Sequence, residues 1–348
     1  MQVSERLYLD HAATTPVLPE ARAAVQRGLE IWANPSSPHA NGRAARAALE
    51  EARERIRKAL AWDGHVIFTS GATEAIAIGL GRTKADRVAT SPIEHDAVLR
   101  VTKSAERLAV DAGGVLGFLP DGPGLWVVQH VNNETGVIQP LAEIGQKARM
   151  QGAILFADCA QSAGKLPLPD ADMIAVSAHK FGGPPGVGAL MVKDLTLLHP
   201  SGGQEQGYRA GTENLPGILA MAAALEMGQG WMEEARSLRK MLDAAIENAG
   251  GEVVAKDSPR SPAIASYRMP GVASSAQLIQ FDMVGISVSA GSACSSGTIK
   301  ASHVLTAMGW DARAAGEIIR VSFGATTSAA DVERFIGAWT DIFGRARS

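Results

Sequence analysis

Six short apolar runs, most of which end in polar residues, constrain the fold of this 348-residue chain more than any other feature. Helical patterns separate several of these runs. Continuous apolar strands that alternate with helices are typical of a mainly parallel sheet covered on both faces, so the sequence predicts an α/β fold. The runs are HVIFTS (65–70), RVATS (87–91), LWVVQHV (125–131), AILFAD (153–158), MIAVS (173–177) and GALMV (188–192).

The length of the chain predicts more than one domain, because one small core cannot organise 348 residues. After about residue 230 the pattern changes: residues 231–250 form an amphipathic helical pattern, and a mixture of short strand-like and helical segments follows. We therefore expect a large domain over residues 14–235. Residues 1–13 and 236–348 are expected to form a smaller α+β domain.

Composition excludes several classes of protein. The net charge of −3 favours no polyanion, so we expect no direct binding of nucleic acid. Two cysteines cannot make a disulfide framework, which favours a reducing compartment. The first sixteen residues contain no targeting pattern, and no apolar stretch reaches membrane-spanning length. We expect a cytoplasmic protein that does not enter a membrane.

Polar side chains gather where the apolar runs end. In parallel sheets ligands bind at the carboxyl edge of the strands, so these residues predict a site. Polar strand ends occur in all proteins, but here they carry His, Asp, Asn, Gln and Lys in place of the usual turn residues. The positions are Ser70–Thr73, His95, Asn132–Glu134, Asp158, Gln161 and Ser177–Lys180.

Three of these positions suggest chemistry. The turn before Ala72 and Thr73 precedes a helical pattern whose first N–H groups can bind a phosphate; alternatively, Thr73 only caps the helix. Lys180 can form a Schiff base with a carbonyl cofactor, or it is an ordinary exposed charge. Asp158 can pair with a protonated pyridine nitrogen, or it caps a helix.

Other residues could complete such a site. His95 is either a general acid or base, a ring that stacks on a cofactor, or a capping residue. The guanidinium of Arg320 could bind a substrate carboxylate, or it could belong to a structural ion pair. Asn34, in a Pro/Ser turn, could help Arg320 to bind the carboxylate. The glycine-rich loop over residues 202–214, which contains Thr212, is either a phosphate or partner contact or a plain surface loop.

The two cysteines lie in different surroundings. Cys294 lies among glycine, serine and alanine, which indicates either an ordinary turn or a thiol that must move. Cys159 follows an apolar strand and is expected to be an inert core thiol. Together, the phosphate cradle, lysine, aspartate, histidine and arginine describe a pyridoxal phosphate enzyme that acts on an amino acid.

The chain resembles the cysteine desulfurases of the class V aminotransferase group, in the subfamily with the cysteine on a long mobile loop. The resemblance runs nearly end to end, and the matching segments fall in family order. They are YLDHAATTP, NPSSPH, GRAAR, FTSGATE, EHDAV, VNNETGVIQP, DCAQSAGK, SAHKFGG, GGQEQGYRAGTEN, GSACSSG, SHVLTAMG and IRVSFGATT. It implies a fold type I pyridoxal phosphate enzyme with a mainly parallel seven-stranded sheet.

The resemblance also implies a role for each matching residue. Lys180 would hold pyridoxal 5'-phosphate, Asp158 would pair with its ring nitrogen, and His95 would stack on the ring. Cys294 would attack the sulfur of L-cysteine, keep it as a persulfide and pass it to an acceptor protein such as an iron–sulfur scaffold. The remaining cofactor residues would be Ala72, Thr73, Asn133, Gln161, Ser177, His179 and, from the second subunit of a homodimer, Thr212, while Asn34 and Arg320 would hold the substrate carboxylate.

Two alternatives remain at this stage. A selenocysteine lyase or a plain class V aminotransferase would keep the fold and the cofactor, although an aminotransferase needs no mobile thiol. An inactive protein of the same fold that binds a sulfur carrier is the alternative from another class, and the presence of Lys180, Asp158, His95 and Cys294 argues against it. The chain departs from the family pattern at His11, at Cys159 and in the FGGPPG segment after Lys180.

Overall fold

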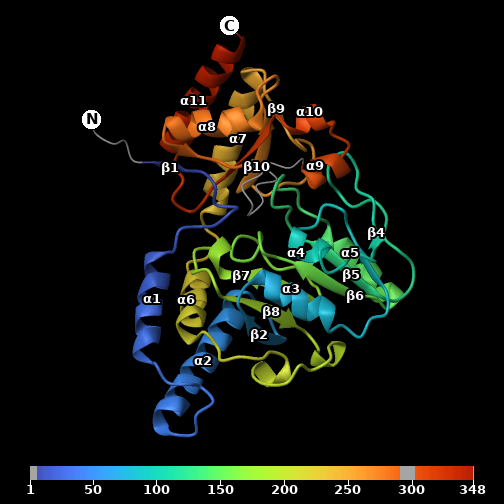
Figure 1. Ribbon diagram of the computed structural model, residues 1–348, viewed down its shortest axis with the longest axis vertical. Helices are drawn as coiled ribbons and strands as arrows, with labels where there is room; N and C mark the ends of the chain where they lie inside the picture. The colour runs from blue at the N-terminus through green and yellow to red at the C-terminus, as the bar shows by residue number, and fades with distance from the viewer. Residues whose placement is uncertain (1–5, 291–301, 348) are drawn as a thin grey trace.

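The computed structural model describes residues 6–290 and 302–347 and divides into two parts, a sheet with flanking helices and a smaller unit above it (Figure 1). Its strands are β1 (Leu7–Tyr8), β2 (His65–Thr69), β3 (Val88–Thr90), β4 (Glu106–Arg107), β5 (Leu125–Gln129), β6 (Ile154–Asp158), β7 (Met173–Ser177), β8 (Gly188–Val192), β9 (Glu252–Val253), β10 (Ile264–Arg268), β11 (Ile286–Ser287) and β12 (Ile318–Ser322).

Most of the helices flank the larger sheet or cover the smaller unit. They are α1 (Pro19–Glu30), α2 (Ala40–Ala59), α3 (Ala72–Gly81), α4 (Asp96–Leu99), α5 (Leu141–Gln151), α6 (Leu215–Glu226), α7 (Met232–Asn248), α8 (Ser274–Met283), α9 (His303–Ala307), α10 (Ala312–Ala315) and α11 (Ala329–Arg347), with short 3-10 helices η1 (Ala178–Lys180), η2 (Leu195–Leu197) and η3 (Glu205–Gly207).

The large sheet has seven strands in the order β2-β8-β7-β6-β5-β3-β4. All neighbouring pairs are parallel except those made by β8, which runs antiparallel to both β2 and β7. This arrangement confirms the α/β fold with a mainly parallel seven-stranded sheet. Each of the six apolar runs forms a strand within a residue or two of its expected bounds.

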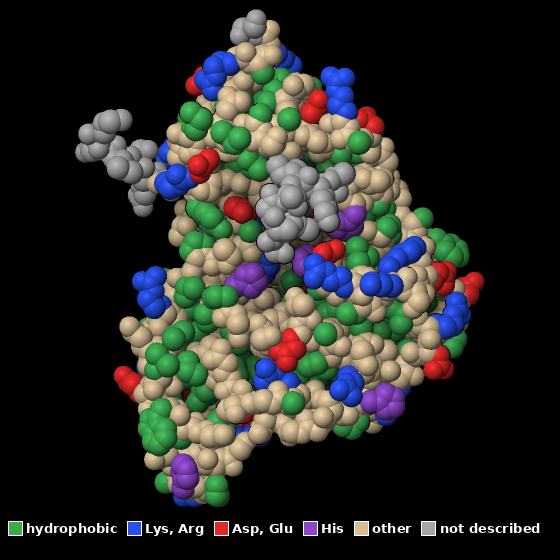
Figure 2. All heavy atoms as spheres, viewed as in Figure 1, with side chains coloured by type: hydrophobic (Ala, Val, Ile, Leu, Met, Phe, Trp, Pro, Cys, Tyr) green, Lys and Arg blue, Asp and Glu red, His purple; other side chains and the backbone are tan. Residues whose placement is uncertain are grey.

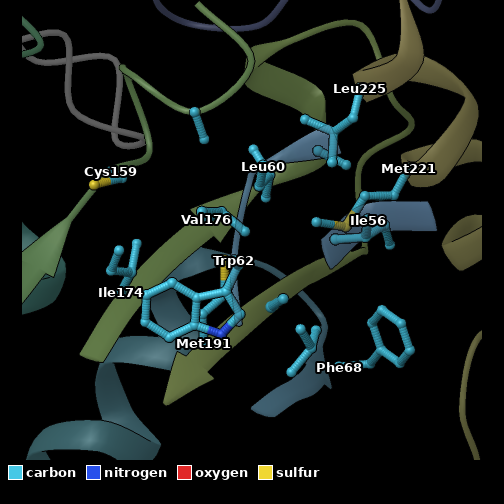
Figure 3. Packing of buried hydrophobic residues seen from close by; sticks show 14 of the residues in the cluster. Ile56, Leu60, Trp62, Phe68, Cys159, Ile174, Val176, Met191, Met221 and Leu225 are labelled. Atoms are coloured by element: carbon cyan, nitrogen blue, oxygen red, sulfur yellow. The ribbon is translucent and has the colours of Figure 1, made fainter. Parts of the chain in front are cut away.

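Side chains alternate between the two faces of this sheet. Val66 and Phe68 pack on the side of α1, α2 and α6, while Ile67 between them packs on the side of α3 and α4. On the first side Val176, Ile174 and Met191 of the sheet face a layer that includes Ile56, Leu60 and Trp62 (Figure 3). Because both faces are covered, only the strand ends remain to carry polar groups.

The smaller unit has its own core. A three-stranded antiparallel sheet in the order β12-β10-β9 and a parallel pair of β1 and β11 pack against α7, α8 and α11. This core takes Leu7 and Leu9 from the start of the chain and residues from Ala235 to Phe343. On this basis we propose the domain division expected from the sequence, with 14–235 as the large domain.

None of the helices within residues 6–290 and 302–347 combines the length and the hydrophobicity that crossing a membrane requires.

A buried ion pair fixes the loop over residues 202–214 to helix α2. Arg53 on α2 donates to both carboxylate oxygens of Glu205, at 2.8 and 3.0 Å, and also to the carbonyl of Val66. The backbone N–H of Phe68 donates to Glu205 at 2.8 Å. The side chains of Arg53 and Glu205 are 10% and 1% exposed. Arg53 also pairs with Glu50 at 2.9 Å, but Glu50 is 44% exposed, so Glu205 is the buried carboxylate that balances the guanidinium.

We expect Glu205→Ala to lower the free energy of unfolding by about 3–5 kcal/mol, because it removes the buried carboxylate and leaves the Arg53 guanidinium with only the half-exposed Glu50 as an ion-pair partner. Glu226→Ala is the matched control, since Glu226 pairs with Arg55 at 2.7 Å but is 44% exposed. That control should cost no more than about 1 kcal/mol. Denaturant unfolding followed by circular dichroism measures both values, and equal losses would contradict the role given to the buried pair.

Candidate active site

A cavity of about 620 Å³ lies at the carboxyl edge of the large sheet, where the two domains meet. Residues of the smaller unit, among them Arg320, form part of its wall. Histidine, acidic and basic side chains gather at this level of the molecule (Figure 2). The cavity brings together Ala72, Thr73, His95, Asn133, Asp158, Gln161, Ser177, His179, Lys180 and Arg320, all of which the sequence analysis singled out.

One end of the cavity is an anion cradle. Helix α3 begins after Gly71, which has a φ of +152° and no capping side chain, so the first N–H groups of the helix have no partner from a cap. A Cβ at Gly71 would lie 3.4 Å from the hydroxyl oxygen of Ser177. The backbone of Ala72 and Thr73 and the side chains of Ser177 and His179 can thus surround a phosphate.

Lys180 lies in η1, directly after β7. Its amine donates to the backbone carbonyls of Ala12 and Ala13, at 2.7 and 2.8 Å. Burial, and then the nearby positive charge of Arg320, lower the pKa of Lys180 to about 8. A lysine with such a pKa is a far better nucleophile at neutral pH than an exposed one, which favours the Schiff-base interpretation over an ordinary surface charge.

Asp158 ends β6 inside the cavity. Its carboxylate accepts a hydrogen bond from the N–H of Ala160 at 2.9 Å, and burial raises its pKa. The capping interpretation and the ring-nitrogen interpretation are therefore compatible, because a cation in the cavity would relieve the cost of burying this carboxylate. Gln161 beside it donates to the carbonyl of Ala12 at 2.8 Å and keeps a buried amide oxygen without a partner among the described residues.

His95 has two roles in the structure. Its Nδ1 accepts the N–H of Ala97 at 3.1 Å, so the ring caps α4 while lining the cavity. Burial lowers the pKa of His95, so the ring is neutral at neutral pH. Because Nδ1 is the acceptor, the proton of the neutral ring lies on Nε2. His95 therefore supplies a hydrogen-bond donor at its other nitrogen.

Arg320 already has a partner in this cavity. Its guanidinium pairs with Asp10 at 2.7 Å and donates to the carbonyl of Asn133 at 2.9 Å. The structural ion pair that the sequence left open is thus present, and a substrate carboxylate would share the guanidinium with Asp10. Sequence reasoning missed Asp10, although the motif YLDHAATTP contains it; its partner lies 310 residues away.

Asn34 and Thr212 do not lie in this cavity. Both line a separate cavity of about 330 Å³ on the outside of the large domain. Asn34 accepts a hydrogen bond from the N–H of Ser36 at 2.9 Å, as in an ordinary turn. The expected cooperation of Asn34 with Arg320 is therefore not present within one chain.

The two cysteines differ in what the structure describes. Cys294 lies outside the described residues. Cys159 is fully buried in the core of the large domain, and burial raises the pKa of its thiol, which fits the expected inert core residue. Neighbouring residues on both sides of 291–301 are placed: Ser289 and Ala290 line the cavity, and Ser302 donates to Glu134 at 2.6 Å.

The donor set fits pyridoxal 5'-phosphate. A lysine amine of lowered pKa meets the requirement for an aldehyde partner, and a buried carboxylate suits a protonated pyridine nitrogen. The uncapped start of α3 suits a phosphate, and the unpaired amide oxygen of Gln161 leaves one polar group to be satisfied by a ligand.

Comparison with known proteins agrees with this geometry. Residues 7–335 match the family described as Aminotransferase class-V. The cysteine desulfurase IscS of Dictyoglomus turgidum is 35% identical, with 99% of this chain and 96% of the relative covered. The IscS-like cysteine desulfurase of Mycobacterium tuberculosis is 37% identical, with coverages of 98% and 97%.

Solved structures are similar over the same length. A NifS-like protein superimposes with a TM-score of 0.89 at 30% identity, covering 98% of this chain and all of the other. The NifS-like protein of Rickettsia africae also gives a TM-score of 0.89, at 28% identity and the same coverage.

We expect the cofactor-free protein to capture pyridoxal phosphate faster as the pH rises, with a midpoint near 8. Only the neutral amine attacks an aldehyde, and the pKa of Lys180 is about 8 where an exposed lysine has 10.5. Stopped-flow absorbance of the Schiff base measures the rate, and Lys180→Ala gives the background from other lysines. A midpoint at pH 10 or above would contradict the lowered pKa.

Proposed function

This chain belongs to the aminotransferase class V family, and on that basis we propose that it is a pyridoxal phosphate-dependent cysteine desulfurase that converts L-cysteine to L-alanine. The sulfur is left as a persulfide on Cys294. The observation that carries the proposal is a single cavity that combines the amine of Lys180, the buried carboxylate of Asp158, the uncapped start of α3 and the guanidinium of Arg320.

Each end of the cavity would hold a different part of the cofactor. The backbone of Ala72 and Thr73, with Ser177 and His179, would bind the phosphate, and Asp158 would pair with the ring nitrogen. His95 would stack on the ring, while Gln161 and Asn133 would contact the side of the phenolic oxygen. When bound, pyridoxal phosphate withdraws electrons from the substrate's α-carbon and so weakens its C–S bond.

The chain's own groups perform the remaining tasks. Arg320 orients the substrate through its carboxylate, at the position where Asp10 now pairs with it at 2.7 Å. The amine of Lys180 would carry the proton of the substrate's α-carbon, and its pKa of about 8 allows both uptake and release near neutral pH.

The thiolate form of Cys294 accepts the sulfur. The thiolate attacks the substrate's Sγ, so that an S–S bond forms and the C–S bond breaks. The electron pair of the broken bond remains with carbon, which takes up a proton, and the product is released as alanine. An ordinary thiol is only a few per cent ionised at neutral pH. The donor at Nε2 of His95 would stabilise the negative charge of a nearby sulfur.

The persulfide sulfur then passes to an acceptor protein, for which we propose a component of iron–sulfur cluster assembly or of a thiolation pathway. We also propose a cytoplasmic location. A chain with only two cysteines, one of them the proposed reactive thiol, suits a reducing compartment.

We further propose a homodimer that brings Thr212 and Asn34 toward the partner's cavity. Trp32 and Leu29, next to both residues, are 75% and 64% exposed, which is unusual for such large apolar side chains. Both carboxylate oxygens of Glu213 are buried without a hydrogen-bond partner among the described residues. A second chain that covers this face would bury the apolar side chains and could supply the missing donor.

We expect Cys294→Ser to reduce cysteine-dependent alanine and sulfide formation by at least about 100-fold, because a serine hydroxyl is un-ionised and a poor acceptor of sulfur. Cys159→Ala is the matched control and should keep its activity, since Cys159 is fully buried. Both products are measured with a thiol reductant present. Full sulfide release by Cys294→Ser would overturn the choice of nucleophile.

For the dimer, Trp32→Glu should raise the dissociation constant at least about 30-fold, the effect of losing one aromatic anchor worth about 2 kcal/mol. Met150→Glu is the control, since Met150 is also exposed, at 78%, but lies on α5. Sedimentation velocity measures both. Thr212→Val should remain dimeric and release pyridoxal phosphate faster; unchanged assembly of Trp32→Glu would contradict the proposed interface.

A further inference from the structure

A second cavity, of about 380 Å³, lies between the start of α1, the chain that joins α6 to α7 and the segment after β12. Lys180 lines both this cavity and the candidate active site. The second cavity is thus next to the reactive amine, yet its other walls come from residues that the proposed reaction does not use. We call it the rear cavity.

Most of the wall of the rear cavity is apolar. This composition favours a ligand with a hydrocarbon body, and the volume is within the range of sites for small organic molecules. The apolar wall includes Val17, Leu18, Phe181, Met227, Trp231 and Phe323.

Lys165 is the exceptional residue of this wall. Lys165 is only 4% exposed. Within residues 6–290 and 302–347, no hydrogen bond or ion pair joins this amine to another residue. Burial, followed by the charges of Lys180 and Arg320, lowers its pKa to about 7. A buried amine without a partner is costly, so an anionic group in the cavity would stabilise it.

The backbone holds Lys165 in this position. Its N–H donates to the carbonyl of Ser162 at 2.9 Å. Gly164 before it has a φ of +71°, and a Cβ there would lie 2.9 Å from the Cβ of Phe181. The turn therefore depends on glycine, and it leaves the lysine side chain against the apolar wall.

Lys165 and Lys180 are the only charged side chains among the described residues that line the rear cavity. His11 also lines the cavity, and burial together with Lys165 lowers its pKa to about 4, so its ring is neutral. Its buried Nδ1 has no hydrogen-bond partner among the described residues. The amine of Lys180 is already bound by the carbonyls of Ala12 and Ala13. Lys165 therefore carries the unpaired charge of this wall.

We propose that the rear cavity binds a small organic acid, with its carboxylate paired to Lys165 and its hydrocarbon part against the apolar wall. The proposal does not depend on the desulfurase reaction, because it rests on residues outside that mechanism. Charge and shape both select the ligand: the buried amine requires an anion, and the apolar wall requires a body that water solvates poorly.

The test uses phenylacetate as the probe and titration calorimetry of the intact protein. We expect one phenylacetate per chain in addition to any binding at Arg320, and this binding should persist in Arg320→Met. Lys165→Met, which keeps the length of the side chain, should weaken it at least about tenfold, the usual effect of losing a charged hydrogen bond. Lys240→Met is the matched control, because Lys240 is exposed on α7.

Phenylacetamide, which has the same shape without the charge, should bind wild type at least about tenfold more weakly than phenylacetate, and this preference should vanish in Lys165→Met. Ala224→Phe, which fills the rear cavity, should abolish binding of both. Thermal melting should show Lys165→Met to be at least as stable as wild type, since it removes an unpaired buried amine. The proposal would be overturned if wild type and Lys165→Met bound phenylacetate equally, or if wild type bound acid and amide equally. It would also be overturned by loss of all binding in Arg320→Met, or by no binding at millimolar phenylacetate.

Discussion

The ion pair between Arg320 and Asp10 is the interaction on which the candidate active site depends. Arg320 comes from β12 of the smaller domain, and Asp10 comes from the segment that leads from β1 into the large domain. Two and three residues further along that segment, the carbonyl groups of Ala12 and Ala13 hold the amine of Lys180. One short stretch of chain thereby positions the guanidinium of Arg320 and the amine of Lys180 relative to each other.

Burial sets the charge state of this region. It lowers the pKa values of Lys180 to about 8 and of His179 to about 4, and it raises that of Glu94 to about 8. Basic groups are thus poised to lose their protons, and acidic groups to keep them. A site of this kind has little net charge of its own, so it can accept a ligand that carries both a phosphate and a protonated ring.

The strands of the large sheet were predictable because their residues follow one another as apolar runs, and the carboxyl-edge rule then placed His95, Asp158 and Lys180 in one site. The reversed direction of β8 was not predictable, since an apolar run has no direction. Edge strand β4, formed by Glu106 and Arg107, has no apolar signal at all. The partnership of Asp10 with Arg320 depends on the folded topology, and the placement of Asn34 and Thr212 in a separate cavity could not be foreseen from their motifs.

The path of the first described residues has a consequence for how the molecule is made. β1 pairs with β11, and the backbone at Asp10 bridges to Ser322, so the residues around Asp10 must wait for partners that are synthesised much later. The seven-stranded sheet is encoded between these two ends and can assemble while they remain apart. A nascent chain would therefore hold Lys180 in place before Arg320 exists, and the cavity would gain its guanidinium only after β12 has been synthesised.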